Sequence, residues 1–190
     1  MTDKESKQAL RARIAEKTAA LDWLYREKAD RAIRFHIYGW SLYQAAGTVF
    51  CYAGTDREID TRELLNSALV GGKRLVLPVC TGPGVMEARA IRSMDELAPG
   101  KYGILAPKPG CPLVEPEEID LAFVPCASGN ARGERLGYGG GFYDRYLPRL
   151  RCPTALLCRK RLIEEDIPME SHDVRIEYFI TEDGIVRCRT

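Results

Sequence analysis

Short apolar runs alternate with helix-like segments along most of this chain, and this alternation constrains its fold more than any other feature. Runs rich in apolar and β-branched residues, each short enough to be a buried strand, occur at 47–54, 74–80, 120–126 and 154–160. Strands that are separated by helices favour a mainly parallel sheet with helices on both faces. The sequence therefore predicts a single three-layer, Rossmann-like α/β domain over residues 1–190.

Helical spacing and punctuation residues predict where the covering helices lie. The predicted helices span residues 3–20, 22–43, 61–72 and 142–150. Thr61 should cap the third helix, which stops at Gly71 and Gly72, and Pro148 should bend or end the fourth. The remaining segments are an extended pair at 174–188, a turn or short helix at 94–100, and an unassigned run at 85–92.

Charge and composition argue against several classes of protein. The 28 Lys and Arg residues nearly balance the 27 Asp and Glu residues, so no overall basic field indicates nucleic-acid binding. No apolar run reaches the roughly 18 residues of a membrane span, and the charged start lacks the apolar core of a secretory signal. Seven cysteines without a C-x-x-C pair predict buried thiols in a reducing compartment. We therefore expect a cytoplasmic protein with no nucleic-acid or membrane partner. Independently of composition, we also expect a monomer that acts on small molecules.

Glycines crowd together in the stretch "RLGYGGGFYDRYL" at 135–147. Each glycine costs roughly 0.5–1 kcal/mol relative to alanine, so a ligand that approaches the backbone closely would explain the cluster. The stretch follows a predicted strand and opens a predicted helix, where backbone N–H groups can bind phosphate. It is neither G-x-G-x-x-G, because Phe142 stands at the last glycine position, nor a Walker A loop. A glycine-rich turn without a ligand is the alternative.

This stretch closely resembles the ATP-binding signature of the 5-formyltetrahydrofolate cyclo-ligase family, Arg-Leu-Gly-x-Gly-x-Gly-Tyr-Tyr-Asp, with Phe142 in place of the first tyrosine. Other segments also resemble the family pattern, so that the resemblance covers most of the chain: "KQALR" (7–11), "REIDT" (57–61), "GKRLVLPVC" (72–80), "DLAFVPC" (120–126) and "SHDVRIEYFIT" (171–181). The resemblance implies an ATP- and Mg²⁺-dependent closure of 5-formyltetrahydrofolate to 5,10-methenyltetrahydrofolate, with release of ADP and phosphate. Such phosphoryl transfer depends on positioning and charge neutralisation rather than on a protein nucleophile.

The resemblance also implies which residues form the site. The expected ATP-binding residues are Lys7, Arg11, Arg135, Leu136, Gly137, Tyr138, Gly139, Gly140, Gly141, Phe142 and Tyr143, and those expected to be catalytic are Lys7, Arg135 and Tyr143. Folate is expected at Ala53, Glu58, Tyr138, Gly139, Gly140, Gly141 and Phe142, and Mg²⁺ at Asp144 and Glu177.

Each of these roles has a simpler alternative. Lys7 and Arg11 are four residues apart on one helical face and can point at one polyphosphate, but a solvated basic face has the same spacing. Asp144 also fits an acid that stabilises a helix N-terminus, Glu177 an outward strand acid, and Glu58 an ordinary loop acid. If Lys7 binds phosphate, the first helix must fold back so that it reaches residues 135–143.

A few departures from the family pattern leave the substrate open. Cys126 stands where glycine is common, Gly129 lies in "SGN" in place of Ala-Phe-Asp, and Ala106 stands where many members have Glu. One alternative is therefore a ligase of the same family that acts on another formyl or amide compound. The other is a nucleotide-binding regulatory module without turnover, and the presence of Lys7, Arg11 and Asp144 argues against it.

Overall fold

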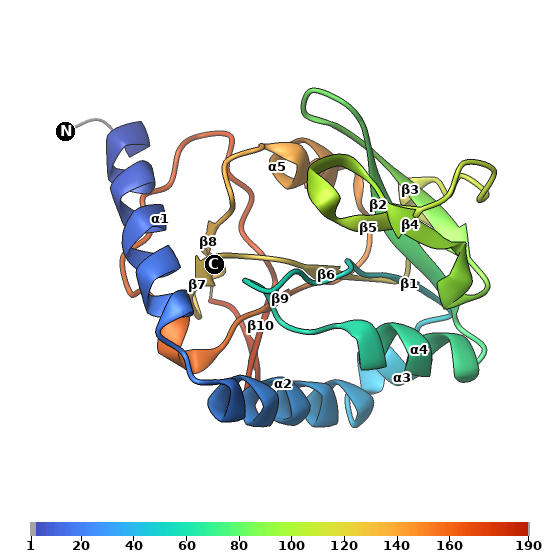
Figure 1. The fold of residues 1–190 in the computed structure, drawn as a ribbon, viewed down its shortest axis with the longest axis horizontal. Helices are drawn as coiled ribbons and strands as arrows, with labels where there is room; N and C mark the ends of the chain where they lie inside the picture. The colour runs from blue at the N-terminus through green and yellow to red at the C-terminus, as the bar shows by residue number, and fades with distance from the viewer. Residues whose placement is uncertain (1–2, 190) are drawn as a thin grey trace.

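The computed structural model describes residues 3–189, and at its centre lies a mainly parallel seven-stranded sheet (Figure 1). The strands lie in the order β11-β10-β9-β6-β1-β2-β3. Neighbours from β10 to β2 pair in parallel, whereas β11 and β3 at the two edges pair antiparallel. Their bounds are β1 Thr48–Phe50, β2 Arg74–Gly82, β3 Val85–Ile91, β6 Leu121–Val124, β9 Thr154–Leu157, β10 Tyr178–Thr181 and β11 Gly184–Arg187. The predicted α/β class is confirmed.

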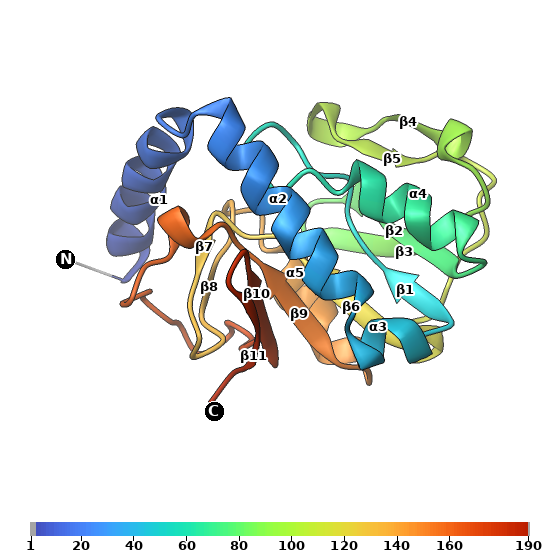
Figure 2. The ribbon, with the colours of Figure 1, turned by 90° about the horizontal axis from the view of Figure 1, so that it is seen from below.

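Helices and loops cover both faces of this sheet. The helices α2 (Trp23–Tyr38), α3 (Ser41–Ala45) and α4 (Arg62–Val70) lie against one face (Figures 1 and 2). The short helix α5 (Phe142–Tyr146) packs with surrounding loops on the other face. Strand side chains alternate between the two cores, because Val49 points toward the helices α2 to α4 and Phe50 points to the opposite side.

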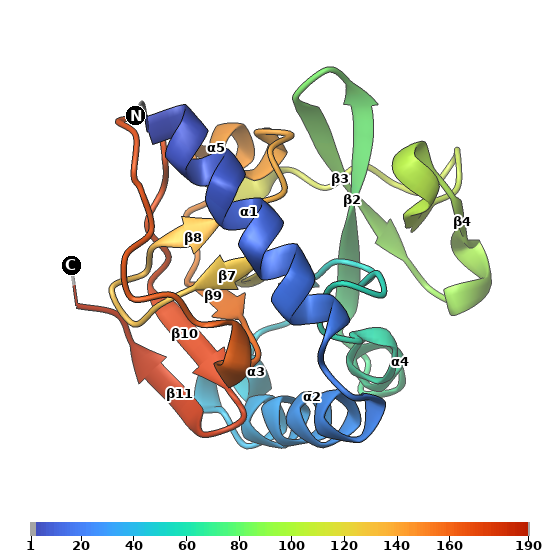
Figure 3. The ribbon, with the colours of Figure 1, turned by 60° about the vertical axis from the view of Figure 1, so that its left-hand side comes forward.

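Helix α1 (Asp3–Ala19) lies apart from these layers, alongside a small hairpin (Figure 3). The hairpin consists of β7 (Ser128–Gly129) and β8 (Arg135–Leu136), which pair antiparallel. Another small sheet joins β4 (Leu97–Pro99) to β5 (Leu105–Pro107) beside the β2–β3 hairpin. Short 3-10 turns lie at Met94–Glu96, Lys101–Gly103, Pro116–Glu118, Leu147–Arg149 and Lys160–Leu162.

The predicted helix over 22–43 is interrupted after Tyr38. Gly39 forms the C-cap of α2, where its N–H donates to the Phe35 carbonyl at 3.3 Å and the Trp40 N–H donates to the Ile37 carbonyl at 3.0 Å. Trp40 then adopts an extended conformation before α3 begins. Its ring packs edge-on against the Tyr178 ring, with 4.9 Å between the centroids. Tyr178 begins β10, which lies far from Trp40 in the sequence. The helix break accompanies this long-range contact, so helical spacing alone does not reveal the break.

Several other elements differ from their predicted bounds. The unassigned run 85–92 contains β3, and 94–100 contains a 3-10 turn followed by β4. The runs 47–54 and 154–160 form strands only in their first halves, and α5 ends at Tyr146. Thr61 lies at the N-cap position of α4, but its hydroxyl makes no cap bond. It donates instead to the Tyr52 carbonyl at 2.6 Å and accepts the Gly54 N–H at 2.9 Å.

The sequence predicts buried thiols and no membrane span, and the structure describes both features. All seven cysteines lie within the described residues and carry free thiols; five are buried, whereas Cys80 and Cys152 are half-buried. Within residues 3–189, no helix combines the length and apolar character that crossing a bilayer requires.

Candidate functional site

A cavity of about 880 Å³ lies beyond the carboxyl ends of the central strands. Residues that follow β1, β6 and β8 line it, together with the far end of β2 and cations of α1. In open α/β sheets this edge is where ligands bind. The volume falls within the range of about 300–1,000 Å³ that is usual for small-molecule sites.

The glycine-rich loop forms one wall of this cavity. Every residue from 135 to 144 lines it. Gly139 and Gly141 have positive φ values of 97° and 64°, a conformation that strains other residues. The loop does not follow β6 directly, because the β7–β8 hairpin intervenes. Helix α5 has 5 residues, so the backbone of the loop, rather than a long helix, would supply N–H donors to a ligand.

Helix α1 brings cations to the same wall. Lys7 and Arg11 both line the cavity, and the Arg11 Nε donates to the Gly137 carbonyl at 2.8 Å. Leu10 and Leu136 belong to one small apolar cluster, which fixes the helix on β8. The first helix therefore folds back onto the glycine loop, as a shared phosphate site requires.

Lys7 does not lie on a solvated face. Its side chain is 7% exposed, and its Nζ forms ion pairs with Glu170, at 2.9 Å, and with Asp173. Burial alone would lower the pKa of Lys7, but the hydrogen bonds to Asp173 and Glu170 outweigh it and raise the pKa above its usual value. Lys7 is thus a charged cation at neutral pH. Neither carboxylate was assigned a role from the sequence.

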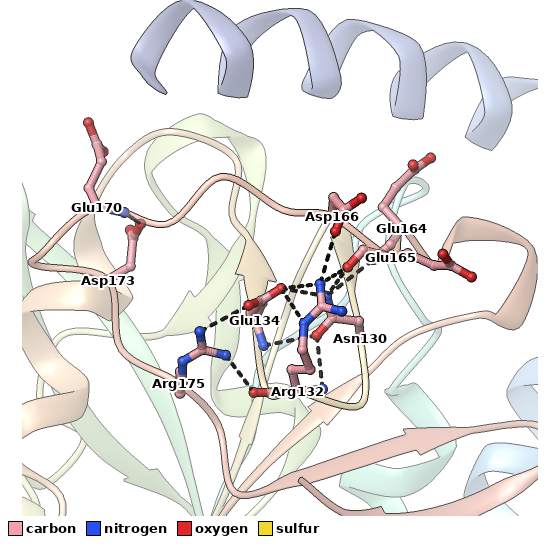
Figure 4. Close-up of polar contacts among 9 residues, drawn as sticks. All are labelled: Asn130, Arg132, Glu134, Glu164, Glu165, Asp166, Glu170, Asp173 and Arg175. Carbon is pink, nitrogen blue, oxygen red and sulfur yellow. Dashed lines mark hydrogen bonds and ion pairs between the residues drawn. The ribbon is translucent and has the colours of Figure 1, made fainter. Parts of the chain in front are cut away.

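The segment 164–175 holds α1 on one side and the β7–β8 hairpin on the other. Toward α1, Glu164 accepts hydrogen bonds from Arg13 and Lys17, each at 2.7 Å. Toward the hairpin, Arg175 pairs with Glu134 at 3.0 Å. Figure 4 shows the other polar contacts between this segment and the hairpin, which involve Asn130, Arg132, Glu165 and Asp166. The position of α1, and with it that of Lys7, thus depends on carboxylates from a distant part of the chain.

The docking of α1 is expected to weaken in acid. Burial raises the pKa of Glu164, but the hydrogen bond from Lys17 contributes to a net lowering. Burial likewise raises the pKa of Asp173, and the hydrogen bond from Lys7 contributes to a net lowering. The hydrogen bond from Lys7 is the main reason that the pKa of Glu170 is lowered. A carboxyl group whose pKa is lowered by folding contributes stability above its unfolded value, and that stability is lost as the pH falls through the folded value. The ordinary values are 4.5 for Glu and 3.8 for Asp, so the loss should begin below these.

Methyl NMR measures this expectation. As the pH falls below about 4, the methyl signals of Leu10 and Ile14, on the buried face of α1, should shift first. The signals of Ile33 and Ile37, in the core beneath α2, serve as the control and should stay in place over the same range. Simultaneous change of both groups would mean that the whole domain unfolds at once and that these ion pairs do not control α1.

Arg135 occupies the base of the glycine loop. Its side chain is 4% exposed, and its Nη2 donates to the Asp144 carboxylate at 2.5 Å. It also lies over the Tyr143 ring, 5.7 Å from the centroid. Burial raises the pKa of Tyr143 well above its usual value, so the phenol stays neutral. The buried Arg135 Nε has no acceptor among the described residues, and an oxygen of a ligand could fill that role.

Glu58 lies on the side of the cavity that follows β1, with Ala53. Its Oε2 accepts the Thr55 N–H and the Thr55 hydroxyl, each at 2.9 Å. Burial raises the pKa of Glu58, against the opposing effect of these hydrogen bonds. The Tyr52 hydroxyl, also at the cavity, is buried and has no partner within residues 3–189. This side therefore offers an acceptor and a hydroxyl to a polar ligand.

Glu177 is the one expected site residue that the structure does not bring to this cavity. It is exposed and stands immediately before β10. Its backbone N–H donates to the Thr154 hydroxyl at 3.3 Å, and its carbonyl accepts the Cys188 N–H at 2.7 Å. The backbone bonds fix the strand entrance, while the carboxylate stays at the surface.

The three departures from the family pattern lie at different depths. Ala106 lines the cavity. Gly129 is buried in β7, where an added Cβ would stand 2.3 Å from the Leu156 side chain, so the packing leaves no room for a larger residue. Cys126 is buried, and its carbonyl accepts the Tyr138 hydroxyl at 3.2 Å. Of these three, Ala106 is the one that lines the cavity, as does Phe142, the departure within the glycine-rich signature.

Comparisons with known proteins agree on one family. The model of the 5-formyltetrahydrofolate cyclo-ligase family matches residues 3–182. The chain belongs to this family. Among curated relatives, the 5-formyltetrahydrofolate cyclo-ligase of Haemophilus influenzae is 28% identical over 90% of this chain and 94% of its own length. That of Mycolicibacterium smegmatis is 29% identical over 97% of this chain and 98% of its own length.

A solved structure gives the same result in three dimensions. The NMR structure of Aquifex aeolicus 5,10-methenyltetrahydrofolate synthetase superimposes with a TM-score of 0.85 at 25% identity, over 97% of this chain and 93% of that one. The fold of this cyclo-ligase family member is therefore shared over nearly its whole length.

Proposed function

We propose that this protein catalyses the ATP- and Mg²⁺-dependent conversion of 5-formyltetrahydrofolate to 5,10-methenyltetrahydrofolate, with release of ADP and phosphate. The observation that carries the proposal is that one cavity gathers the glycine loop, the cations Lys7, Arg11 and Arg135, and the carboxylate of Glu58. Membership of the 5-formyltetrahydrofolate cyclo-ligase family supports the same activity.

The wall made by α1 and the glycine loop suits the phosphates of ATP. We assign ATP to Lys7, Arg11 and the loop Arg135 to Tyr143, where cations and backbone N–H groups face one space. Gly139 and Gly141, whose positive φ favours glycine, carry no side chain that would occupy that space. The unpartnered Arg135 Nε adds a donor for a phosphate oxygen.

Asp144 is the residue that we assign to Mg²⁺. Its carboxylate lines the cavity beside Arg135, and hard cations prefer carboxylate oxygen while they retain several waters. A bound Mg²⁺ would neutralise phosphate charge. Glu177, the other expected ligand, would act only after a movement that brings it from the strand entrance into the cavity.

The wall made by Glu58 suits the folate. A pterin ring presents adjacent N–H donors, and the hydrogen bonds that Thr55 gives to Glu58 end on Oε2, so Oε1 can accept from such a donor. Ala53, Tyr138 and Phe142, which we also assign to folate, line the same cavity and offer apolar contact.

In the proposed reaction the γ-phosphoryl group of ATP passes to the formyl oxygen, N10 of the folate attacks the activated carbon, and phosphate leaves. Lys7 and Arg135 would hold and neutralise the charge on the phosphoryl oxygens, which is the main demand of phosphoryl transfer. Tyr143, a neutral phenol under the Arg135 guanidinium, would keep that guanidinium in place. Placement of the two substrates in one cavity replaces a protein nucleophile.

An absorbance assay tests the proposed function. The purified protein, given 5-formyltetrahydrofolate and MgATP, should form the methenyl product, and removal of ATP or chelation of Mg²⁺ should stop its formation. Turnover of another formyl or amide compound, without turnover of this folate, would favour the alternative ligase that Ala106 at the cavity wall allows. Binding of ATP with no turnover of any such compound would instead favour a regulatory module.

The expected surroundings and assembly state are part of the same proposal. We propose a cytoplasmic monomer that binds ATP and a reduced folate, and no nucleic acid or membrane. The near balance of 28 basic and 27 acidic residues supports the absence of a nucleic-acid partner. Sedimentation analysis measures the assembly state.

A further inference from the structure

A buried ion pair lies outside the cavity and joins α2 to the segment that follows β9. The Arg159 guanidinium grips the Asp30 carboxylate with two hydrogen bonds, Nε to Oδ1 at 2.7 Å and Nη2 to Oδ2 at 2.8 Å. The two side chains are 3% and 5% exposed. Replacing a buried pair by apolar side chains is often neutral or stabilising. Stability alone is therefore a weak reason for this pair.

Both members of the pair also bind the backbone of the loop that follows β1. The Arg159 Nη2 donates to the Glu58 carbonyl at 2.7 Å, and the Asp30 Oδ2 accepts the Asp60 N–H at 2.9 Å. These bonds flank Ile59, which is buried in the core beneath α2. The backbone of the loop is thus held on both sides of Ile59, at the Glu58 carbonyl and at the Asp60 N–H.

The ends of the loop are also held by Thr61, whose hydroxyl binds the Gly54 N–H and the Tyr52 carbonyl, but the residues between them bond mainly to one another. The upper part is a tight turn in which the Glu58 N–H donates to the Thr55 carbonyl at 2.9 Å, and Thr55 in turn binds the Glu58 carboxylate. Asp56, at its tip, is exposed. A turn that bonds mainly to itself keeps its shape but can tilt as a unit, so its orientation toward the cavity is set where it is anchored.

We propose that Asp30 and Arg159 are positioning residues that orient the loop 55–60, so that the carboxylate of Glu58 meets the reduced folate. The inference rests on the proposed function. It also predicts a division of roles: the pair acts on the folate side of the cavity, whereas the cations assigned to ATP come from α1 and β8. Loss of the pair should therefore weaken the use of folate and leave the use of ATP nearly unchanged.

Kinetics of Arg159→Lys test this division. Lysine keeps the positive charge but lacks the fork that reaches Asp30 and the Glu58 carbonyl together. We expect KM for 5-formyltetrahydrofolate to rise by roughly 10- to 100-fold, because the displaced Glu58 carboxylate would lose its charge-assisted hydrogen bond to the folate. KM for MgATP should hardly change. An unchanged KM for the folate in folded protein would overturn the proposal.

The matched control is Arg161→Lys. Arg161 is two residues further on and pairs with Asp22 at the start of α2, so it joins the same two parts of the chain. That pair is 3.7 Å long, with side chains 60% and 62% exposed. Both KM values should stay at those of the unaltered protein. A rise equal to that of Arg159→Lys would mean that the junction as a whole matters, which would contradict the proposal.

A double-mutant cycle with Glu58→Gln separates positioning from general stability. If Arg159 acts through Glu58, then Arg159→Lys should cost little additional folate affinity in the Glu58→Gln background. Additive effects would overturn the assignment. In all these measurements the unaltered protein must first make the methenyl product, so failure of the proposed function is seen separately.

Two further measurements avoid variants that alter only one member of the Asp30–Arg159 pair and that could fail to fold for that reason. The double variant Asp30→Leu with Arg159→Met leaves no charge buried without its partner, and it should fold yet show the same rise in KM for the folate. In the unaltered protein, the Asp60 amide, which is bonded to Asp30, should exchange its hydrogen at least about ten times more slowly than the amide of the exposed Asp56. Equal exchange rates would show that the hydrogen bond from the Asp60 N–H to Asp30 is not formed in solution.

Discussion

Lys7→Met is expected to lower the affinity for MgATP by roughly 10- to 150-fold, because a charge-assisted hydrogen bond is worth about 1.5–3 kcal/mol. The substitution removes the ammonium but leaves Glu170 and Asp173 at the cavity wall. Their carboxylates would then repel the phosphates that Lys7 is proposed to bind, so the loss should lie toward the upper part of this range. Calorimetry with MgATP gives the affinity, and the methenyl assay gives kcat/KM.

Lys17→Met is the matched control for this variant. Lys17 belongs to the same helix and also pairs with a carboxylate of the segment 164–175, but its side chain is 44% exposed and does not line the cavity. It should bind MgATP like the unaltered protein. If Lys7→Met also binds normally, Lys7 serves only to dock α1, and the assignment of its ammonium to phosphate is wrong.

Gly141→Val is expected to abolish formation of the methenyl product in protein that still folds. Gly141 has a φ of 64° and lines the cavity. A branched side chain there would occupy space that we assign to ligands, and an added Cβ would already stand 3.3 Å from the Arg145 guanidinium. Some stability should also be lost, because a side chain in the left-handed region costs about 1–2 kcal/mol. The measurement is activity per folded molecule, with folding followed by circular dichroism and thermal melting.

Gly72→Val separates the loss of ligand space from backbone strain. Gly72 follows α4 with a φ of 74°, and an added Cβ would meet no atom within 4 Å. This variant should lose comparable stability and keep the activity of the unaltered protein per folded molecule. If Gly141→Val, once folded, turns over at the unaltered rate, the glycine-rich loop is a structural turn and does not contact the substrates.

The order of the main elements could be predicted because each is encoded locally. The apolar run at 120–126 contains β6, and the helical spacing at 61–72 gives α4. The break between α2 and α3 could not be predicted in this way, since it accompanies the packing of Trp40 on Tyr178. The β7–β8 hairpin was also missed, because its strands have two residues each and carry no periodic signal.

The same division holds for the site. The crowding of glycines and the spacing of Lys7 and Arg11 are local patterns, and the structure brings both to one cavity. The partners of Lys7 could not be identified in this way, because Glu170 and Asp173 lie 163 and 166 residues away in sequence. The two acidic residues stand in the stretch "ESHD" at 170–173, but a charged stretch in a single sequence does not indicate which basic residue it pairs with.

The attachment of α1 has a consequence for the order in which this protein can assemble during translation. The helix leaves the ribosome well before the residues that hold it, which come from much later in the chain: Ala127 and Leu136, then Glu164, Ile167, Glu170 and Asp173. Until these emerge, α1 has none of the contacts that fix it, and contacts between distant segments form slowly. The side of the cavity that we assign to ATP should therefore be completed only after Asp173 has emerged, when strands β1 and β2 are already available to pair.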